Sequence, residues 1–236
     1  MARRAALHST PSRELVALAV RDNARFKGVV SEIERRAPDR AAFDAIVVAR
    51  ASGAMPPWLA AVLLGRARID DGYAMVRQIL VDAPGLLAES YAGAAMARLG
   101  GERAFDDLAA LMLDAPRLVS REGAAEGLAL LRRPTTASLL LRATRQGRIR
   151  RQTAACLVGD LPDAASTIAE WLGGDDALAE QMAIGAALAY LARVDAVLPP
   201  ALAHAVEVTI RSGRVKQSPS TRQHLLERLQ RAASKA

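Results

Sequence analysis

One feature constrains the fold of this chain more than any other, a helical segment that recurs about every 30 residues. The segment 119–131 returns at 149–161, an offset of 30, and places Arg121 in the same position as Arg151. Among the pairs of adjacent alanines in this alanine-rich chain, those that begin at 60, 94, 124, 154 and 186 recur close to this period, and we call these the alanine pairs. A helix pair of this length is too small to bury its own apolar face, so recurrence at a fixed period predicts helical units that stack on one another.

The composition restricts the secondary structure to helices. Hydrophobic residues make up 51% of the chain but aromatic residues only 3%, so the core must be aliphatic. Alanine and leucine are strong helix formers, and no alternating apolar and polar run bounded by turn residues predicts a strand. The tripeptide Asp-Ala-Pro begins at Asp82 and again at Asp114, and it closes a helix each time. The predicted fold class is all-α.

Turn and cap residues divide the chain into helices. Thr10 and Pro11 open a helix whose apolar spacing continues to Arg36, and the motif helix of 149–161 opens at Arg148. Further helices are expected over 39–52, 57–68, 72–81, 86–99, 102–113, 163–172, 175–191, 199–211 and the residues after Ser218. We expect glycines that follow leucine, such as Gly65, to end helices in the left-handed conformation. The alanine pairs should let successive helix pairs pack closely.

We expect one continuous domain with three segments: an N-terminal helical cap over 1–50, the repeats over 51–212, and a basic C-terminal helix and tail over 213–236. The longest uncharged apolar stretches, around 54–65 and 182–192, are shorter than the ~18 residues of a membrane span, which predicts no membrane association. A single cysteine excludes an intrachain disulfide and fits the reducing cytosol, so we expect a cytoplasmic protein.

The net charge of +7 is distributed in blocks of alternating sign. Between positions 117 and 151, two glutamates oppose nine arginines, Arg117, Arg121, Arg132, Arg133, Arg142, Arg145, Arg148, Arg150 and Arg151. The next block, 160–180, holds six acidic residues and no basic one, and the chain from Arg211 onward is basic again. Such blocks indicate charged surfaces with separate roles rather than one uniform shell for a polyanion.

The arginine-rich stretch is the candidate binding site. Its predicted anchors for a partner are Arg117, Arg121, Arg148, Arg150 and Arg151, and a secondary basic patch comprises Arg132, Arg133, Arg142 and Arg145. Arg148 and Arg151 share a helix face if the helix opens at Arg148, and stacking of the repeats would place Arg121 ~10 Å from Arg151. Three interpretations stay open: internal salt bridges to acids such as Glu122, Glu126 and Asp160, an acidic protein segment, and a phosphate backbone.

No pattern of residues predicts catalysis, a metal or a cofactor. His8, His204 and His224 are far apart in the sequence and show no metal-ligand spacing. The glycine pairs follow helices rather than strands, so a phosphate-binding loop is not expected. Cys156 lies beside an alanine pair and is expected to be a buried small side chain, the alternative being a thiol activated by Arg150 and Arg151.

The segment Ile149-Arg150-Arg151-Gln152-Thr153-Ala154-Ala155-Cys156-Leu157-Val158-Gly159 resembles the Val-Arg-x-Ala-Ala-x-x-Leu-Gly helix of HEAT repeats. The likeness extends over about 86–192, is fainter from 57, and is closest to the short HEAT-like units also found in phycobilisome lyases. This resemblance implies an armadillo-like α-solenoid of helical hairpins wound as a right-handed superhelix. It also implies that the Ala-Ala helices are second in each pair and line the concave face.

The resemblance implies a binding scaffold rather than an enzyme, and the leading hypothesis is a non-enzymatic adaptor for a protein partner with an acidic surface. One alternative is a nucleic-acid-binding protein similar to HEAT-like DNA glycosylases, although 3% aromatic residues leave few stacking platforms for bases. The acidic block 160–180 would also repel a long duplex. A second alternative is a bilin lyase-type chaperone, which only the repeat class supports.

Overall fold

The computed structural model describes residues 7–82, 86–193, 197–215 and 218–233. Within these ranges the chain forms fourteen α-helices and one short 3-10 helix, and it contains no strand. The all-α prediction is therefore confirmed. The chain divides into two compact units, Met1–Leu131 (unit 1) and Arg132–Ala236 (unit 2), and each is described by itself. The three-segment division of the sequence stays a prediction.

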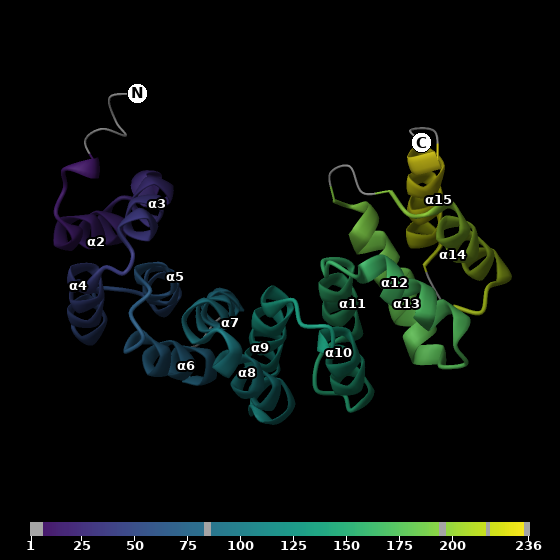
Figure 1. The fold of residues 1–236 in the computed structure, drawn as a ribbon, viewed down its shortest axis with the longest axis horizontal. Coiled ribbons are helices and arrows are strands. Elements are labelled where there is room, and N and C mark those ends of the chain that lie inside the picture. Colours follow the sequence, from purple (N-terminus) through teal and green to yellow (C-terminus); the bar gives the residue numbers. More distant parts are fainter. Residues whose placement is uncertain (1–6, 83–85, 194–196, 216–217, 234–236) are drawn as a thin grey trace. The chain divides into compact units, whose positions relative to one another are not determined.

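Unit 1 consists of helix pairs that follow one another along the chain (Figure 1). Its elements are α2 (Ser12–Arg21), η1 (Asn23–Arg25), α3 (Phe26–Arg36), α4 (Arg40–Ala51), α5 (Pro57–Ala67), α6 (Gly72–Asp82), α7 (Leu86–Gly100), α8 (Glu102–Asp114) and α9 (Leu118–Leu131). The odd-numbered helices α3, α5, α7 and α9 form a row in which each contacts the next. Helices α2, α4, α6 and α8 each pack against the odd-numbered helix that follows in the chain.

The single helix predicted from Thr10 to Arg36 is wrong, because the chain turns at Asp22. The Asp22 carboxylate accepts a hydrogen bond from the Ala24 backbone N–H at 3.0 Å and lies 3.0 Å from the Arg25 guanidinium. An aspartate side chain that bonds to the backbone two residues on competes with the helix. The turn folds α3 back on α2 and adds a helix pair to the N-terminal segment.

Glycines bring the odd-numbered helices together instead of ending them. A Cβ on Gly93 of α7 would overlap the carbonyl oxygen of Gly123 in α9, and one on Gly127 would lie 2.5 Å from the carbonyl oxygen of Gly93. Gly65, which was expected to end its helix, lies inside α5 where a Cβ would be 2.8 Å from that of Ala95. That expectation is wrong, and the left-handed C-cap of α5 is Arg68 (φ 52°).

Unit 2 has the same close contacts between alanine-bearing helices. Its helices are α10 (Thr136–Arg145), α11 (Arg151–Gly159), α12 (Ala164–Gly173), α13 (Ala177–Leu191), α14 (Pro200–Ser212) and α15 (Pro219–Ala233). Helix α11 packs along α13, where a Cβ on Gly185 would lie 2.8 Å from that of Ala155. The Asp176 carboxylate caps α13 by accepting from the N–H groups of Leu178 and Ala179, as expected of an acid at a helix start.

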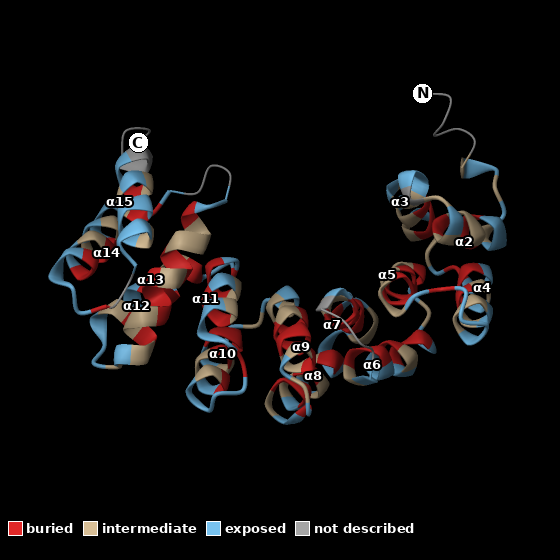
Figure 2. Ribbon diagram, turned by 180° about the vertical axis from the view of Figure 1, so that it is seen from behind, coloured by how far each residue is buried: buried red, intermediate tan, exposed pale blue. Residues whose placement is uncertain are grey.

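The core of each unit is aliphatic and lies where the helices face one another (Figure 2). The alanine pairs contribute to it directly: Ala124, Ala154, Ala186 and Ala187 are fully buried. Small side chains at these crossings let two helix axes approach closely, as the sequence predicted. Among the helices that the structure describes, none has the length and hydropathy needed to cross a membrane.

Candidate functional site

The two predicted anchors in unit 1 are engaged in internal contacts. The Arg117 guanidinium donates to the carbonyl oxygen of Val81 at 2.8 Å and lies 3.1 Å from the carboxylate of Glu89, which is buried. Arg121 donates to the carbonyl oxygens of Ala115 (2.8 Å) and Pro116 (3.3 Å) just before α9. Both side chains are half-buried. These contacts hold turns of unit 1 in place, as the internal-contact interpretation expects of arginines in this stretch.

The three predicted anchors in unit 2 are exposed. Helix α11 begins at Arg151, not at Arg148, so Arg148 and Arg150 lie in the turn that precedes it. The turn forms because Gly147 takes a left-handed conformation (φ 67°) and Ile149 enters the core. Arg148 and Arg151 therefore do not share a helix face. The predicted pairing of Arg121 with Arg151 joins one residue from each unit and stays a prediction.

Arg151 lines a pocket of about 450 Å³ in unit 2, formed by α11, α13 and α15. The lining residues are Arg151, Gln152, Ala155, Cys156, Gln181, Gly185, Leu188, Ala189, Ala192, Thr221, His224 and Arg228. We call this the basic pocket, because its lining includes two arginines and no carboxylate. The sequence did not predict a role for Arg228; the only signal was the basic character of the C-terminal segment.

Hydrogen bonds within the basic pocket orient its two guanidinium groups. Arg151 donates to the side-chain oxygen of Gln181 on α13. Arg228 donates to the carbonyl oxygen of Leu191 at 2.8 Å and to the Nε2 atom of His224 at 2.9 Å. These partners are neutral oxygens and a ring nitrogen, so the positive charges are held in place without being cancelled. An arginine fork positioned in this way can bind a carboxylate or a phosphate.

The four arginines of the secondary basic patch differ in exposure and in the contacts that they make. Arg145 at the end of α10 makes an ion pair with Asp176, the N-cap of α13. Burial alone would raise the pKa of Asp176, but the backbone N–H groups that it caps and the Arg145 guanidinium hold it below the ordinary value. Arg132 and Arg142 are exposed, and Arg133 is half-buried. Arg145 therefore stabilises unit 2.

Cys156 does not have the environment that the sequence predicted. Its side chain is exposed on α11 and lines the basic pocket, whereas a buried position was expected. Partial burial and the nearby Asp160 carboxylate raise the pKa of the Cys156 thiol. The alternative of a thiol activated by Arg150 and Arg151 is therefore not supported, because the shift is opposite to the one that activation requires.

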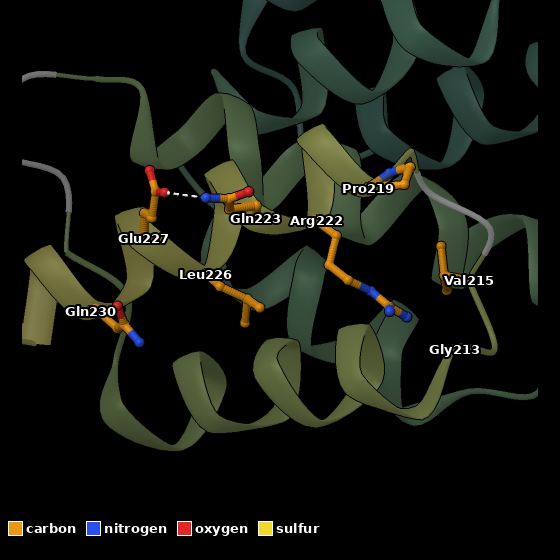
Figure 3. A pocket seen from close by; sticks show the side chains of 8 residues that line it. All are labelled: Gly213, Val215, Pro219, Arg222, Gln223, Leu226, Glu227 and Gln230. Carbon is orange, nitrogen blue, oxygen red and sulfur yellow. Dashed lines mark hydrogen bonds between the residues drawn. The ribbon is translucent and has the colours of Figure 1, made fainter.

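Two other hollows of unit 2 suit an anion less well, because one has the carboxylate of Glu227 in its lining and the other has no charged residue. A pocket of about 500 Å³ lies between α14 and α15 (Figure 3). There Arg222 donates to the carbonyl oxygen of Ile210 at 2.9 Å, and Gln223 donates to Glu227 at 3.0 Å. A groove of about 580 Å³ between α12 and α14 is lined mainly by apolar residues and by no charged one. The basic pocket is therefore the better candidate for an anionic ligand.

Within the described ranges, no group of three or more His, Cys, Asp or Glu side chains is placed to hold a metal ion. Comparison with known proteins assigns no family: a scan of protein-family models, a search of curated proteins and a search of solved structures each found no match.

Proposed function

We propose that this chain is a non-enzymatic scaffold of HEAT-like helical hairpins, wound as a right-handed α-solenoid, that binds an acidic segment of a protein partner. The observation that carries the proposal is the basic pocket, where Arg151 and Arg228 are positioned by neutral hydrogen-bond partners and no carboxylate lines the walls. The exposed Arg148 and Arg150 precede α11 and add positive charge next to it in the chain.

The fold proposal is supported by two features of each unit. Consecutive helices pair, and the helices that carry the alanine pairs contact one another in chain order, α5 with α7, α7 with α9, and α11 with α13. Each of these helices is second in its pair, as the resemblance to HEAT repeats implies. Repeated pairs of this kind present equivalent side chains along a common surface.

Each arginine has its own part in the proposed function. Arg151 and Arg228 bind carboxylates of the partner directly, since a guanidinium offers two parallel donors to a carboxylate. Arg148 and Arg150 speed the encounter through their charge, an effect that salt weakens. Arg117 and Arg121 stabilise unit 1 through the contacts described above and take no direct part in binding.

A protein segment fits the basic pocket better than a nucleic acid does. No Phe, Tyr or Trp lines it, so it lacks the large ring faces on which bases stack best. The glycosylase-like alternative needs an aromatic and an acidic residue in one groove, and the basic pocket has neither. The bilin chaperone alternative has no support among its lining residues.

The test is a fluorescence anisotropy titration with a labelled 12-residue peptide rich in Glu and Asp but free of apolar residues. We expect the double variant Arg151→Met, Arg228→Met to weaken binding at least about tenfold, while Arg13→Met, an exposed arginine of α2, leaves it unchanged. Equal affinities of the double variant and the parent would overturn the proposal. So would tighter binding of a single-stranded oligonucleotide, with its steep loss of affinity at moderate salt.

A further inference from the structure

A row of three aromatic side chains crosses unit 1 along α3, α5 and α7. The ring centroids of Phe26 and Trp58 are 5.7 Å apart, and those of Trp58 and Tyr91 are 6.2 Å apart. The whole chain has only three Phe, two Trp and three Tyr. Three of these eight aromatic residues thus lie side by side on α3, α5 and α7. We call Phe26, Trp58 and Tyr91 the aromatic row.

The aromatic row is partly open to solvent. Tyr91 is 39% exposed, and Leu87, one turn earlier on α7, is 63% exposed. Phe26 and Trp58 are half-buried. Leu87 and Tyr91 are four residues apart and therefore share a helix face. Large apolar side chains that stay exposed in a group indicate a binding surface more than a packing need.

A basic cluster lies two turns further along the same helices. Arg66 is eight residues after Trp58 and Arg98 is seven after Tyr91, so each arginine lies on the same helix face as its aromatic residue, ~10–12 Å along the axis. Glu34 occupies the equivalent place on α3, eight residues after Phe26. We call Glu34, Arg66, Arg68 and Arg98 the basic cluster.

Charge in the basic cluster is only partly compensated. Glu34 makes an ion pair with Arg66 and lies 4.0 Å from the Arg68 guanidinium. Arg98 is exposed and makes no ion pair with any residue that the structure describes. Partial burial together with the charges of Arg66 and Arg68 lowers the pKa of Arg98. The basic cluster thus contains one carboxylate and three guanidinium groups. An anionic group of a ligand would compensate the positive charge that remains.

We propose that α3, α5 and α7 form a docking surface for an acidic amphipathic helix of a partner protein. The aromatic row and the basic cluster form two parallel strips ~10–12 Å apart, which is about the diameter of an α-helix with its side chains. A helix lying across the three helices places its apolar side chains on the aromatic row and its carboxylates on Arg98 and Arg66. The ring centroids of Phe26 and Tyr91 are at most about 12 Å apart, which corresponds to about two turns of the bound helix.

The geometry of the rings favours a peptide over single-stranded nucleic acid. Bases stack on open ring faces, but Phe26 and Trp58 meet edge to face at 68° and are both half-buried. Val62 of α5, one turn after Trp58, and the exposed Leu87 add aliphatic surface beside the rings. Aliphatic surface packs against Leu, Ile or Phe side chains of a helix. It offers no polar or charged group to a sugar-phosphate backbone.

This surface is independent of the basic pocket. It belongs to unit 1 and requires an apolar face on the ligand. A failure of one proposal therefore leaves the other untouched. The highly acidic peptide without apolar residues should therefore bind through the basic pocket but not here.

The experiment uses the full chain and a 14-residue peptide with Leu at positions spaced 3, 4 and 3 residues apart and Glu on one flank. Its comparison peptides are an isomer of equal composition without an apolar face and a version with Lys in place of Glu. We expect Tyr91→Ser and Arg98→Glu, both at exposed positions, to weaken binding of the Glu peptide about tenfold in calorimetry. Arg98→Glu should also strengthen binding of the Lys peptide.

Three controls separate the outcomes. Arg77→Glu, an exposed position on α6, and the double variant Arg151→Met, Arg228→Met should leave the affinity for the Glu peptide unchanged. Circular dichroism of each variant checks that the helices are retained. The proposal is overturned if the Glu peptide does not bind, if it binds no better than its isomer, if Tyr91→Ser and Arg98→Glu have no effect, or if an oligothymidylate binds more tightly at this surface.

Discussion

The same motif position has different roles in the two units. Arg121 is the fourth residue of α9 and bonds back to carbonyl oxygens of the turn before its helix. Arg151, 30 residues later, is the first residue of α11 and bonds forward to Gln181. The difference arises in the preceding turn: unit 1 has a short Asp-Ala-Pro turn, whereas unit 2 has a longer one with Gly147 in a left-handed conformation. A repeated sequence therefore gives two arginines equivalent positions in the motif, but the preceding turn determines what their side chains contact.

The two units also differ in how they use charge and close packing. In unit 1 the crossing of α7 and α9 is backbone against backbone, and Arg117 lies against a buried carboxylate. In unit 2 the crossing of α11 and α13 also brings backbones together, since a Cβ on Gly159 would lie 2.6 Å from the carbonyl oxygen of Ala186, but Gly185 meets only the methyl group of Ala155. Exposed arginines precede or begin α11. Unit 1 therefore uses Arg117 in an internal contact with a buried carboxylate, whereas Arg151 of unit 2 is exposed and contacts a neutral side chain. Because unit 1 contains Trp58 and unit 2 contains Trp171, fluorescence of Trp171→Phe and Trp58→Phe backgrounds follows each unit separately.

The largest effect is expected from glycine substitutions. Gly93→Ala should lower the free energy of unfolding of unit 1 by about 3 kcal/mol or more, because the new methyl group overlaps a backbone carbonyl that cannot move aside. Gly185→Ala should cost unit 2 about 1–2 kcal/mol, because it meets only an alanine side chain. Gly173→Ala, with open space around it, should be neutral or slightly stabilising. Urea unfolding followed by tryptophan fluorescence measures all three, and equal costs at Gly93 and Gly185 would show that the backbone contact and the methyl contact are equally rigid.

The next effect concerns Arg117. Its replacement by Met should destabilise unit 1 by about 3 kcal/mol, because the buried Glu89 carboxylate then has no counter-charge. The matched change Arg151→Met in unit 2 should alter stability by less than about 0.5 kcal/mol, since the side chain is exposed. Thermal unfolding of the two variants measures the loss of stability caused by each change. A larger loss for Arg151→Met would mean that the arginines of the two units have exchanged their expected roles.

Glu32 should make unit 1 sensitive to acid. Hydrogen bonds from Arg35 outweigh the effect of burial and, with that from Arg36, lower the pKa of Glu32 to about 2. A carboxyl whose pKa is lower in the folded state stabilises the fold above its ordinary pKa, and this contribution is lost as the pH falls from about 4.5 toward 2. Glu32→Gln should cost about 2 kcal/mol at pH 7 and flatten the acid limb of the Trp58 unfolding curve. An unchanged acid limb would contradict the assignment.

The smallest effect is expected at Cys156, which labels unit 2 alone because it is the only cysteine. The thiol should react completely with iodoacetamide, since it is exposed, but more slowly at pH 8 than free cysteine, since its pKa is raised. Asp160→Asn should speed the reaction about twofold by removing a charge that raises this pKa. The acidic peptide should slow labelling, because Cys156 lines the basic pocket. Protection that persists in the Arg151→Met, Arg228→Met variant would place the peptide elsewhere.

The sequence predicted the helices well where turn chemistry was local. The helices from 39 to 113 begin and end within a few residues of their predicted bounds, and the Asp39 and Asp176 side chains cap the helices that follow them. The break at Asp22 was missed because the apolar spacing continues across it. The role of Gly65 was misread because a glycine that follows a leucine has the same local sequence in a cap and in a helix crossing; only the neighbouring helix distinguishes them.

The candidate sites were harder to predict because they depend on which helices become neighbours. Arg228 joins the basic pocket through the packing of α15 near α11 and α13, which no spacing in the sequence specifies. The aromatic row had a signal: Phe26, Trp58 and Tyr91 are spaced by 32 and 33 residues, close to the repeat period. This spacing was not used because residues 1–50 were treated apart from the repeats; in the structure α3 contacts α5.

The glycine crossing of α7 and α9 has a consequence for motion. No side chains of the two helices separate their backbones at Gly93, Gly123 and Gly127. Neither helix can therefore open locally at its centre without displacing the other. Amide hydrogens on both sides of the crossing should therefore exchange with solvent through one shared opening event, at a common rate that reports the stability of the pair rather than of either helix.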